Sequence, residues 1–213
     1  MSLLYVDKSP GWKLAWEDKL FRKRVYIGLA SLILIFACLP FFFVYVQQRP
    51  GTLLNDWILN AIPVHNVSPL IFICIWATFL LMIVRSFQQP AFFITMLYAY
   101  SLLCIFRFIT MFLVPLEAPT GLIPLVDPLS NMMYGKTFIT KDLFFSGHTS
   151  ILFLMCLCFP GKKDKYFSFV TATLVGILVL VQHVHYSIDV LMAPFFSFLA
   201  FIITKKMDTF GGE

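Results

Sequence analysis

The feature that most constrains this chain is a series of six long apolar blocks. As helices of roughly 16–25 residues, they have the length needed to cross the hydrocarbon core of a bilayer. The hydrophobic fraction of 60% exceeds the roughly one half that is typical of soluble domains. The sequence therefore predicts an all-α, polytopic membrane protein built as a six-helix transmembrane bundle. The expected spans cover residues 25–45, 67–84, 90–115, 143–160, 166–183 and 185–204.

These spans divide the chain into a cytoplasmic interfacial segment (1–24), a six-span transmembrane catalytic domain (25–204) and a cytoplasmic tail (205–213). In the first segment, Trp12, Trp16 and Leu20 recur every four residues with charged residues between them. This pattern is typical of a helix that lies in the membrane interface. An irregular polar leader remains the alternative.

The distribution of lysine and arginine predicts the orientation, because these residues are enriched in cytoplasmic loops. Twelve of the 16 lie in the terminal segments and in the loops after the second and fourth spans. The alternate loops, 46–66 and 116–142, carry only Arg49, Lys136 and Lys141. Both termini are therefore expected in the cytoplasm. The loops that carry the candidate site are then expected on the exoplasmic side, periplasmic or lumenal.

Ionisable side chains inside the spans mark the candidate site. His148 begins the fourth span, and His185 and Asp189 begin the sixth. Arg107 precedes Pro115 by eight residues, which is roughly 12 Å along a helix. Ionisable groups at such depth are expensive and usually functional. Each has a simpler explanation, since a lone histidine is often a helix cap and a lone arginine often snorkels. Their coincidence on one side favours a site.

The spacing of these residues indicates their chemistry. His185 and Asp189 are four residues apart, so on one helix face the carboxylate can hold one imidazole proton and leave the other nitrogen basic. Ser146 and Gly147 begin the fourth span, where free amides can point at an anion, and His148 follows them. Two histidines, a carboxylate and an arginine around an anion suggest phosphoryl transfer, with the arginine on the equatorial oxygens.

Three motifs carry a resemblance to a known family. "DLFFSGHT" (142–149) followed by "HYSIDV" (185–190) resembles the paired signatures of the sphingomyelin synthase family. That family belongs to the type 2 phosphatidic acid phosphatase superfamily. "FRFITMFLVPLEAP" (106–119) is similar to a third family motif, and "NDWILNAIPVH" (55–65) is weakly similar to a first-loop motif. The resemblance runs from about residue 104 to 192.

The resemblance implies a lipid head-group phosphotransferase. His185 would attack the phosphorus of a donor phospholipid and form a phosphohistidine, and Asp189 would orient it. His148 would protonate the leaving diacylglycerol and then deprotonate the hydroxyl of ceramide or another lipid alcohol. No cofactor and no metal is implied, and no nucleic acid is expected as a partner. The expected substrate-binding residues are Arg107, Asp142, Ser146, Gly147, Tyr186 and Glu117.

Two of these assignments leave alternatives open. Glu117 and Asp127 of the outer loop could hold a cationic head group such as choline or ethanolamine, or could be solvated loop charges. The donor phosphate is the anion that we expect beside Arg107. If Arg107 instead forms a structural ion pair, Glu117 is the first candidate for its partner.

The chain also departs from the family pattern. Thr140 and Lys141 stand where the family has a Cys-Gly pair, although Asp142 matches. Tyr100 and Val179 replace a lysine and an arginine of the superfamily's soluble-substrate phosphatases. Losing two phosphate-binding cations favours a phosphodiester donor over a dianionic monoester. A lipid phosphate phosphatase, a phospholipase C-like hydrolase and a catalytically silent lipid-binding protein remain alternatives. The head group and the oligomeric state stay open.

Overall fold

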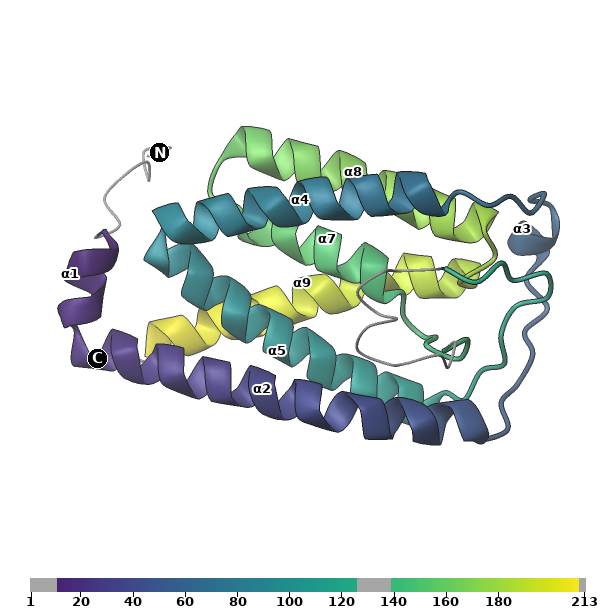
Figure 1. Ribbon diagram of the computed structural model, residues 1–213, viewed down its shortest axis with the longest axis horizontal. Coiled ribbons are helices and arrows are strands. Elements are labelled where there is room, and N and C mark those ends of the chain that lie inside the picture. Colours follow the sequence, from purple (N-terminus) through teal and green to yellow (C-terminus); the bar gives the residue numbers. More distant parts are fainter. Residues whose placement is uncertain (1–10, 126–138, 211–213) are drawn as a thin grey trace.

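The computed structural model describes residues 11–125 and 139–210, and this part of the chain is helical without a strand (Figure 1). Five helices are long and apolar enough to cross a membrane. A shorter apolar helix, α7 (Gly147–Cys158), packs among them, and α1 (Trp12–Glu17) and α3 (Trp57–Asn60) are brief. The five long helices are α2 (Lys19–Gln48), α4 (Ser68–Gln88), α5 (Pro90–Leu113), α8 (Lys162–Val181) and α9 (Ser187–Phe210). The predicted all-α, polytopic membrane class is confirmed.

Helix α7 corrects the fourth expected span. At 12 residues it is about 18 Å long, well short of the ~30 Å hydrocarbon core. It begins at Gly147 because Ser146 caps it, with Ser146 Oγ accepting a hydrogen bond from the Thr149 amide. It ends before Phe159, whose helical conformation is disfavoured by the proline that follows. The expected 143–160 span is therefore a short internal helix preceded by four non-helical residues.

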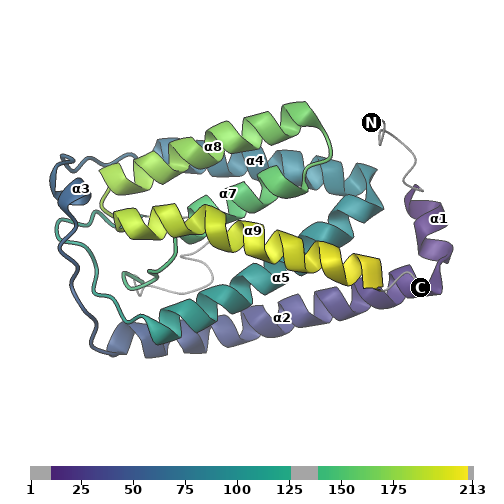
Figure 2. The same cartoon turned by 180° about the vertical axis from the view of Figure 1, so that it is seen from behind.

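The helices form an elongated bundle with two different ends (Figures 1 and 2). We call the end that carries α3 and the long connections the loop end. The end that carries α1 and the described termini is the terminal end. Helix α7 packs against α8, α9 and α5, while α4 lies on α8 and α2 lies on α5. This arrangement places the beginnings of α7 and α9, and the last turns of α5, near the loop end.

The turn between α8 and α9 holds the loop end together. His183, which is 6% exposed, contacts backbone carbonyl oxygens with both ring nitrogens. Its Nδ1 lies 3.0 Å from the Thr120 oxygen and its Nε2 lies 3.0 Å from the Ile62 oxygen. Gln182 is fully buried, and its Oε1 accepts a hydrogen bond from the Val67 amide at 3.2 Å. Two adjacent side chains thus tie both neighbouring loops to one turn.

The segment before the first span contains the expected helix, but that helix ends at Glu17 and a second helix begins at Lys19. Helix α1 ends at Glu17, and the Asp18 side chain accepts a hydrogen bond from the Leu20 amide as the N-cap of α2. The Trp12 indole Nε1 donates to the Ser86 carbonyl oxygen at the end of α4, with a distance of 3.0 Å. Trp12 is therefore docked on the bundle, while Trp16 is 40% exposed. Placement of α1 in the membrane interface stays a prediction.

The orientation of the bundle is a testable prediction. In a background that lacks the five native cysteines, Asn60→Cys in α3 should react with a membrane-impermeant maleimide from outside the cell. Lys163→Cys at the terminal end should react only after permeabilisation, because lysine and arginine favour the cytoplasmic side. Both positions are exposed, so access alone does not separate them. The opposite pattern would place the loop end in the cytoplasm.

Lys136 and Asp127, which the sequence analysis places in the outer loop, lie outside the described residues.

Candidate active site

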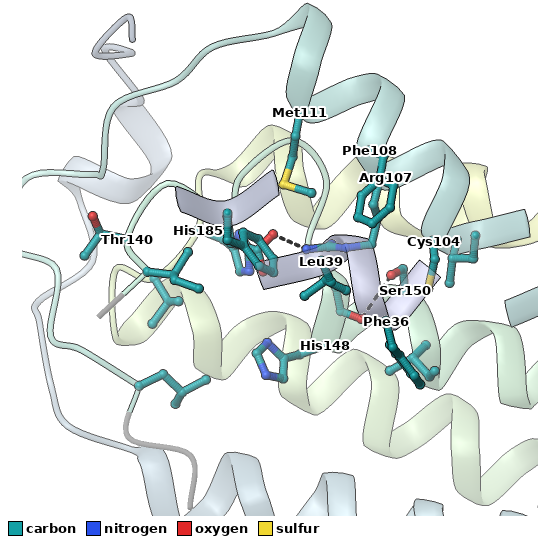
Figure 3. Close-up of a pocket in the computed structure, with 18 of the residues that line it drawn as sticks. Phe36, Leu39, Cys104, Arg107, Phe108, Met111, Thr140, His148, Ser150 and His185 are labelled. Carbon is teal, nitrogen blue, oxygen red and sulfur yellow. Dashed lines mark hydrogen bonds and ion pairs between the residues drawn. The ribbon is translucent and has the colours of Figure 1, made fainter. Parts of the chain in front are cut away.

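Three of the expected site side chains meet at a cavity of about 310 Å³ near the loop end. Arg107 from α5, His148 from α7 and His185 from the segment before α9 all line it. In Figure 3 these three side chains approach the same region from their different elements. Asp142 and Gly147 also contribute to the wall. Residues spread over 79 positions of sequence thereby place polar groups in one pocket whose lining is otherwise mainly apolar.

The His185–Asp189 pair is formed as predicted, but through a different local structure. His185 Nδ1 lies 3.2 Å from Asp189 Oδ2, and the two residues are 2% and 0% exposed. Sequence reasoning placed both on one face of a helix, whereas α9 begins only at Ser187. Asp189 is the third helical residue, and its Oδ2 also accepts from the Tyr186 amide at 3.1 Å. This is the back-reaching half of a capping box.

The partners of Asp189 favour one tautomer of His185. Asp189 accepts hydrogen bonds from two backbone amides, Tyr186 N at Oδ2 and Phe144 N at Oδ1, the latter at 3.2 Å. A proton on His185 Nδ1 would make the ring the third donor to this carboxylate. That tautomer would place the lone pair on Nε2. It would leave a nucleophilic nitrogen at a histidine that lines the cavity.

Arg107 lies against the first turn of α7. Its Nη1 donates to the Phe145 carbonyl oxygen at 2.6 Å, and its Nη2 donates to Asp142 Oδ1 in an ion pair. The approach to α7 requires a glycine, because a Cβ at Gly147 would lie 2.7 Å from Arg107 Cζ. The anion beside Arg107 is thus Asp142, so Glu117 is wrong as its suggested partner. The arginine sits between a resident carboxylate and a helix N-terminus.

The amides at this N-terminus are only partly free. The Ser146 amide donates to the Asp189 carbonyl oxygen at 3.0 Å, and Ser146 Oγ is engaged with Thr149. Ser146 is fully buried and lies outside the cavity wall. Ser146 caps α7, and its expected contact with the substrate stays a prediction. The first amides of an α-helix point along its axis and away from the helix, and Gly147, the first residue of α7, lines the cavity.

Two other expected substrate ligands are engaged elsewhere. Glu117 Oε1 pairs with Lys141 Nζ at 2.7 Å and accepts from the Gly51 amide at 2.9 Å. The bond from Lys141 lowers the pKa of the Glu117 carboxyl below its usual value. The Tyr186 hydroxyl donates to the Glu117 carbonyl oxygen at 2.9 Å and its side chain is buried. Neither Glu117 nor Tyr186 lines the cavity; both brace the loop end instead.

Asp56 is a supporting residue that the sequence reasoning did not assign. Its Oδ2 accepts from the Ser187 amide at 2.6 Å and its Oδ1 accepts from Ser187 Oγ at 2.9 Å. It also caps α3 through the amides of Ile58 and Leu59. Burial acts to raise the pKa of Asp56, but its hydrogen bonds, chiefly from Ser187, lower it. An aspartate before a short apolar stretch is the usual N-cap signal. Asp56 stands in that position within the first-loop motif, so this signal could have identified it.

No group of three or more His, Cys, Asp or Glu side chains that could hold a metal ion exists in the described part of the chain. The expectation of a metal-free site stays a prediction, because it concerns the reaction and not these side chains alone. The polar groups that line the cavity are instead suited to acid–base, nucleophilic and anion-binding roles.

Comparison with known proteins agrees with this chemistry. Residues 141–207 match the family model described as the C-terminal part of the PAP2 superfamily, the type 2 phosphatidic acid phosphatases. The matched region contains Asp142, His148, His185 and Asp189, whereas Arg107 lies outside it. No curated protein matches the chain. The match supports lipid phosphatase or phosphotransferase chemistry in general, and an enzyme.

The contact between Arg107 and Gly147 gives a prediction. Gly147→Ala should displace the guanidinium, since the new Cβ cannot share its space. We expect turnover of a labelled phospholipid to fall by about 10²-fold, the cost of misplacing a positioning group by roughly 1 Å. Gly11→Ala, whose Cβ meets nothing within 4 Å, is the control. Normal turnover in Gly147→Ala would separate Arg107 from the reaction, provided that melting in detergent shows both variants folded.

Proposed function

We propose that this protein is a phosphotransferase that moves a phospho-head-group from a glycerophospholipid to ceramide or another lipid alcohol, through a phosphohistidine. The observation that carries the proposal is the buried His185–Asp189 pair at the wall of a cavity shared with His148 and Arg107. The resemblance to sphingomyelin synthases supports the transfer reaction. The charge distribution of the loops supports an active site on the exoplasmic side.

In the first step, His185 Nε2 attacks the phosphorus of the donor. The new N–P bond forms as the bond between phosphorus and the glycerol oxygen breaks. His148, in its protonated form, gives its proton to that oxygen, and diacylglycerol leaves. Asp189 holds the Nδ1 proton throughout and stabilises the charge that develops on the His185 ring. Arg107 and the amides at the start of α7 are near enough to the pocket to face the phosphoryl oxygens.

In the second step, the acceptor hydroxyl replaces diacylglycerol. His148 is now neutral and takes the hydroxyl proton as the oxygen attacks phosphorus. The N–P bond breaks, the electron pair returns to His185 Nε2, and the head group leaves on the acceptor. His148 ends the cycle protonated, as it began. The same two residues therefore serve both half-reactions, and no external acid or base is consumed.

The sparse positive charge of the cavity favours a phosphodiester donor. Among the described residues, Arg107 is the one lysine or arginine that lines the cavity, and Asp142 already pairs with it. Tyr100 lines the same wall, and Val179 is fully buried in the hydrophobic core. Both stand where phosphatases of the superfamily carry cations. The same positive charge would compensate a smaller share of the charge of a dianionic phosphate monoester than of a singly charged diester.

A hydrolase that uses water as the acceptor is the second candidate, because the matched family includes lipid phosphatases. Purified protein should be incubated with a phospholipid labelled in its head group, with and without ceramide or diacylglycerol. A transferase moves the label to the added lipid. A hydrolase releases it into water, and a silent lipid-binding protein leaves the donor intact. Label that never reaches a lipid acceptor would overturn the proposed transfer.

The nucleophile can be tested directly. His185→Ala should abolish both transfer and hydrolysis, because both pass through the phosphohistidine. Asp189→Asn should reduce the rate by about 10²–10⁴-fold, the range for losing a positioned acid–base partner. His65→Ala is the matched control, since His65 is exposed and lies outside the cavity. Retained activity in His185→Ala would remove His185 from the mechanism.

The ion pair beside the cavity gives a separate prediction. Arg107→Lys keeps the charge but loses the planar fork that reaches both Asp142 and the Phe145 carbonyl. It should fold and turn over slowly. Asp142→Asn keeps the shape but frees the guanidinium for the substrate, so we expect a smaller loss of turnover than in Arg107→Lys, together with a lower melting temperature. Rates and melting curves for both variants, measured in one detergent, check this order. Equal losses in the two variants would contradict it.

A further inference from the structure

A second, larger cavity lies beside the polar one. Its volume is about 590 Å³, within the usual range of small-molecule sites, and its walls come from α2, α4 and α5. The lining is almost entirely apolar, with Phe79, Ile83 and Met96 among its residues. Figure 1 shows α5 running from beside α4 at the terminal end to beside α2 near the loop end. Phe87 at the rim is 76% exposed, so the cavity meets the surface that the membrane would cover.

The two cavities adjoin at an aromatic neck. Phe36, Tyr100 and Ile151 line both of them. The rings of Phe36 on α2 and Tyr100 on α5 are tilted against one another, with their centroids 6.3 Å apart. Arg107 and the histidines lie on one side of this neck, and the lining on the other side is almost entirely apolar. An amphipathic ligand whose head lies in the first cavity therefore has an apolar cavity beside it.

The length of the two adjoining cavities suits a lipid chain. Along α5, Arg107 and Phe93 are 14 residues apart, which corresponds to roughly 21 Å. Half the hydrocarbon core of a bilayer is about 15 Å. The combined cavities therefore extend from the candidate head-group site past the depth that one leaflet provides. A chain bound here would run along the protein and meet the membrane-facing surface at the rim that carries Phe87.

Trp12 lies at the far end of the second cavity, next to Phe93. Its ring lines the second cavity and lies 5.4 Å, centroid to centroid, from the ring of Phe93. The indole hydrogen bond to the Ser86 carbonyl oxygen fixes this position. Helix α1 thus contributes Trp12 to the wall of the second cavity, although α1 is not one of the helices long enough to span the membrane. Trp16 of the same helix does not line the cavity.

We propose that the second cavity binds one hydrocarbon chain of the lipid substrate, and that Trp12 limits the length of chain it accepts. This proposal rests on the proposed function, because it assumes that the phosphate and ester region of the same lipid lies in the polar cavity. The shared wall at Phe36 and Tyr100 places the second cavity next to the candidate head-group site, and this adjacency favours a chain attached to that head group as the occupant.

Photolabelling tests the proposal without any turnover. The probe is a phosphatidylcholine that carries a diazirine near the end of one chain, in detergent–lipid micelles with the full-length protein. We expect adducts on Met82, Phe93 and Met96. Ile83→Trp should fill the cavity and remove at least nine-tenths of this labelling. Val84→Trp, its exposed neighbour on α4, should leave it unchanged. Adducts confined to the lipid-facing surface, or equal labelling in both variants, would overturn the proposal.

Chain-length selectivity tests the role of Trp12. Turnover should be compared for donors with hexanoyl, palmitoyl and lignoceroyl chains. Trp12→Ala should raise kcat/KM for the lignoceroyl lipid relative to the palmitoyl lipid by about tenfold, while Trp16→Ala should not. Ile83→Trp should lose the palmitoyl substrate but keep the hexanoyl one. An unchanged chain profile in all three variants would overturn the length limit.

The two proposals fail in different ways. If no head group is transferred or released but Ile83→Trp still removes the chain-end adducts, the proposed function is wrong and the chain site stands. If transfer occurs but Ile83→Trp behaves like Val84→Trp in labelling and chain profile, the chain site is wrong and the proposed function stands. Melting curves of the variants in detergent identify any that do not fold, and the labelling of the unaltered protein then decides.

Discussion

The site depends on one buried carboxylate. Asp189 is fully inaccessible, and an ion at such a position is tolerated only when hydrogen bonds compensate its lost hydration. Its carboxylate oxygens are hydrogen-bonded to the ring of His185 and to the amides of Tyr186 and Phe144. Its backbone carbonyl oxygen accepts a hydrogen bond from the amide of Ser146. These bonds join the start of α9 to the segment that leads into α7. The same charge therefore orients the candidate nucleophile and fixes where the two site-bearing helices begin.

The loop end is organised around this constraint by a second layer of polar contacts. Asp56 holds Ser187 at the first turn of α9, and His183 and Gln182 secure the loops on either side. Glu117 and Lys141 pair beside them. These groups lie outside the cavity, yet they restrict the backbone on which His185 and Asp189 sit. Glu117, for example, has the chemistry of a substrate ligand in the sequence, but in the structure it stabilises the loop end through its contacts with Lys141 and Gly51.

The sequence predicted what depends on local pattern. Apolar block length predicted five of the six helices, with ends that differ from the observed ones by up to six residues, and the four-residue spacing predicted the His185–Asp189 contact. The sequence-based predictions were wrong where tertiary contacts determine the local structure or the partner of a side chain. Helix α7 is short because Ser146 caps it after a non-helical approach, and His185 precedes its helix because His183 adopts a left-handed backbone with φ of 55°. Asp142, and not Glu117, meets Arg107. No spacing rule links residues 35 positions apart in different elements.

The charges of the pocket connect substrate binding to proton transfer. Arg107 and Asp142 compensate one another. On the proposed chemistry, Asp189 beside a neutral His185 contributes one negative charge, and a phosphodiester adds a second. Such an excess of negative charge is costly next to apolar side chains, and a proton on His148 would relieve it. The donor thus favours the imidazolium form that its own leaving group requires. After diacylglycerol departs with that proton, His148 is neutral again, which is the form that the acceptor hydroxyl needs.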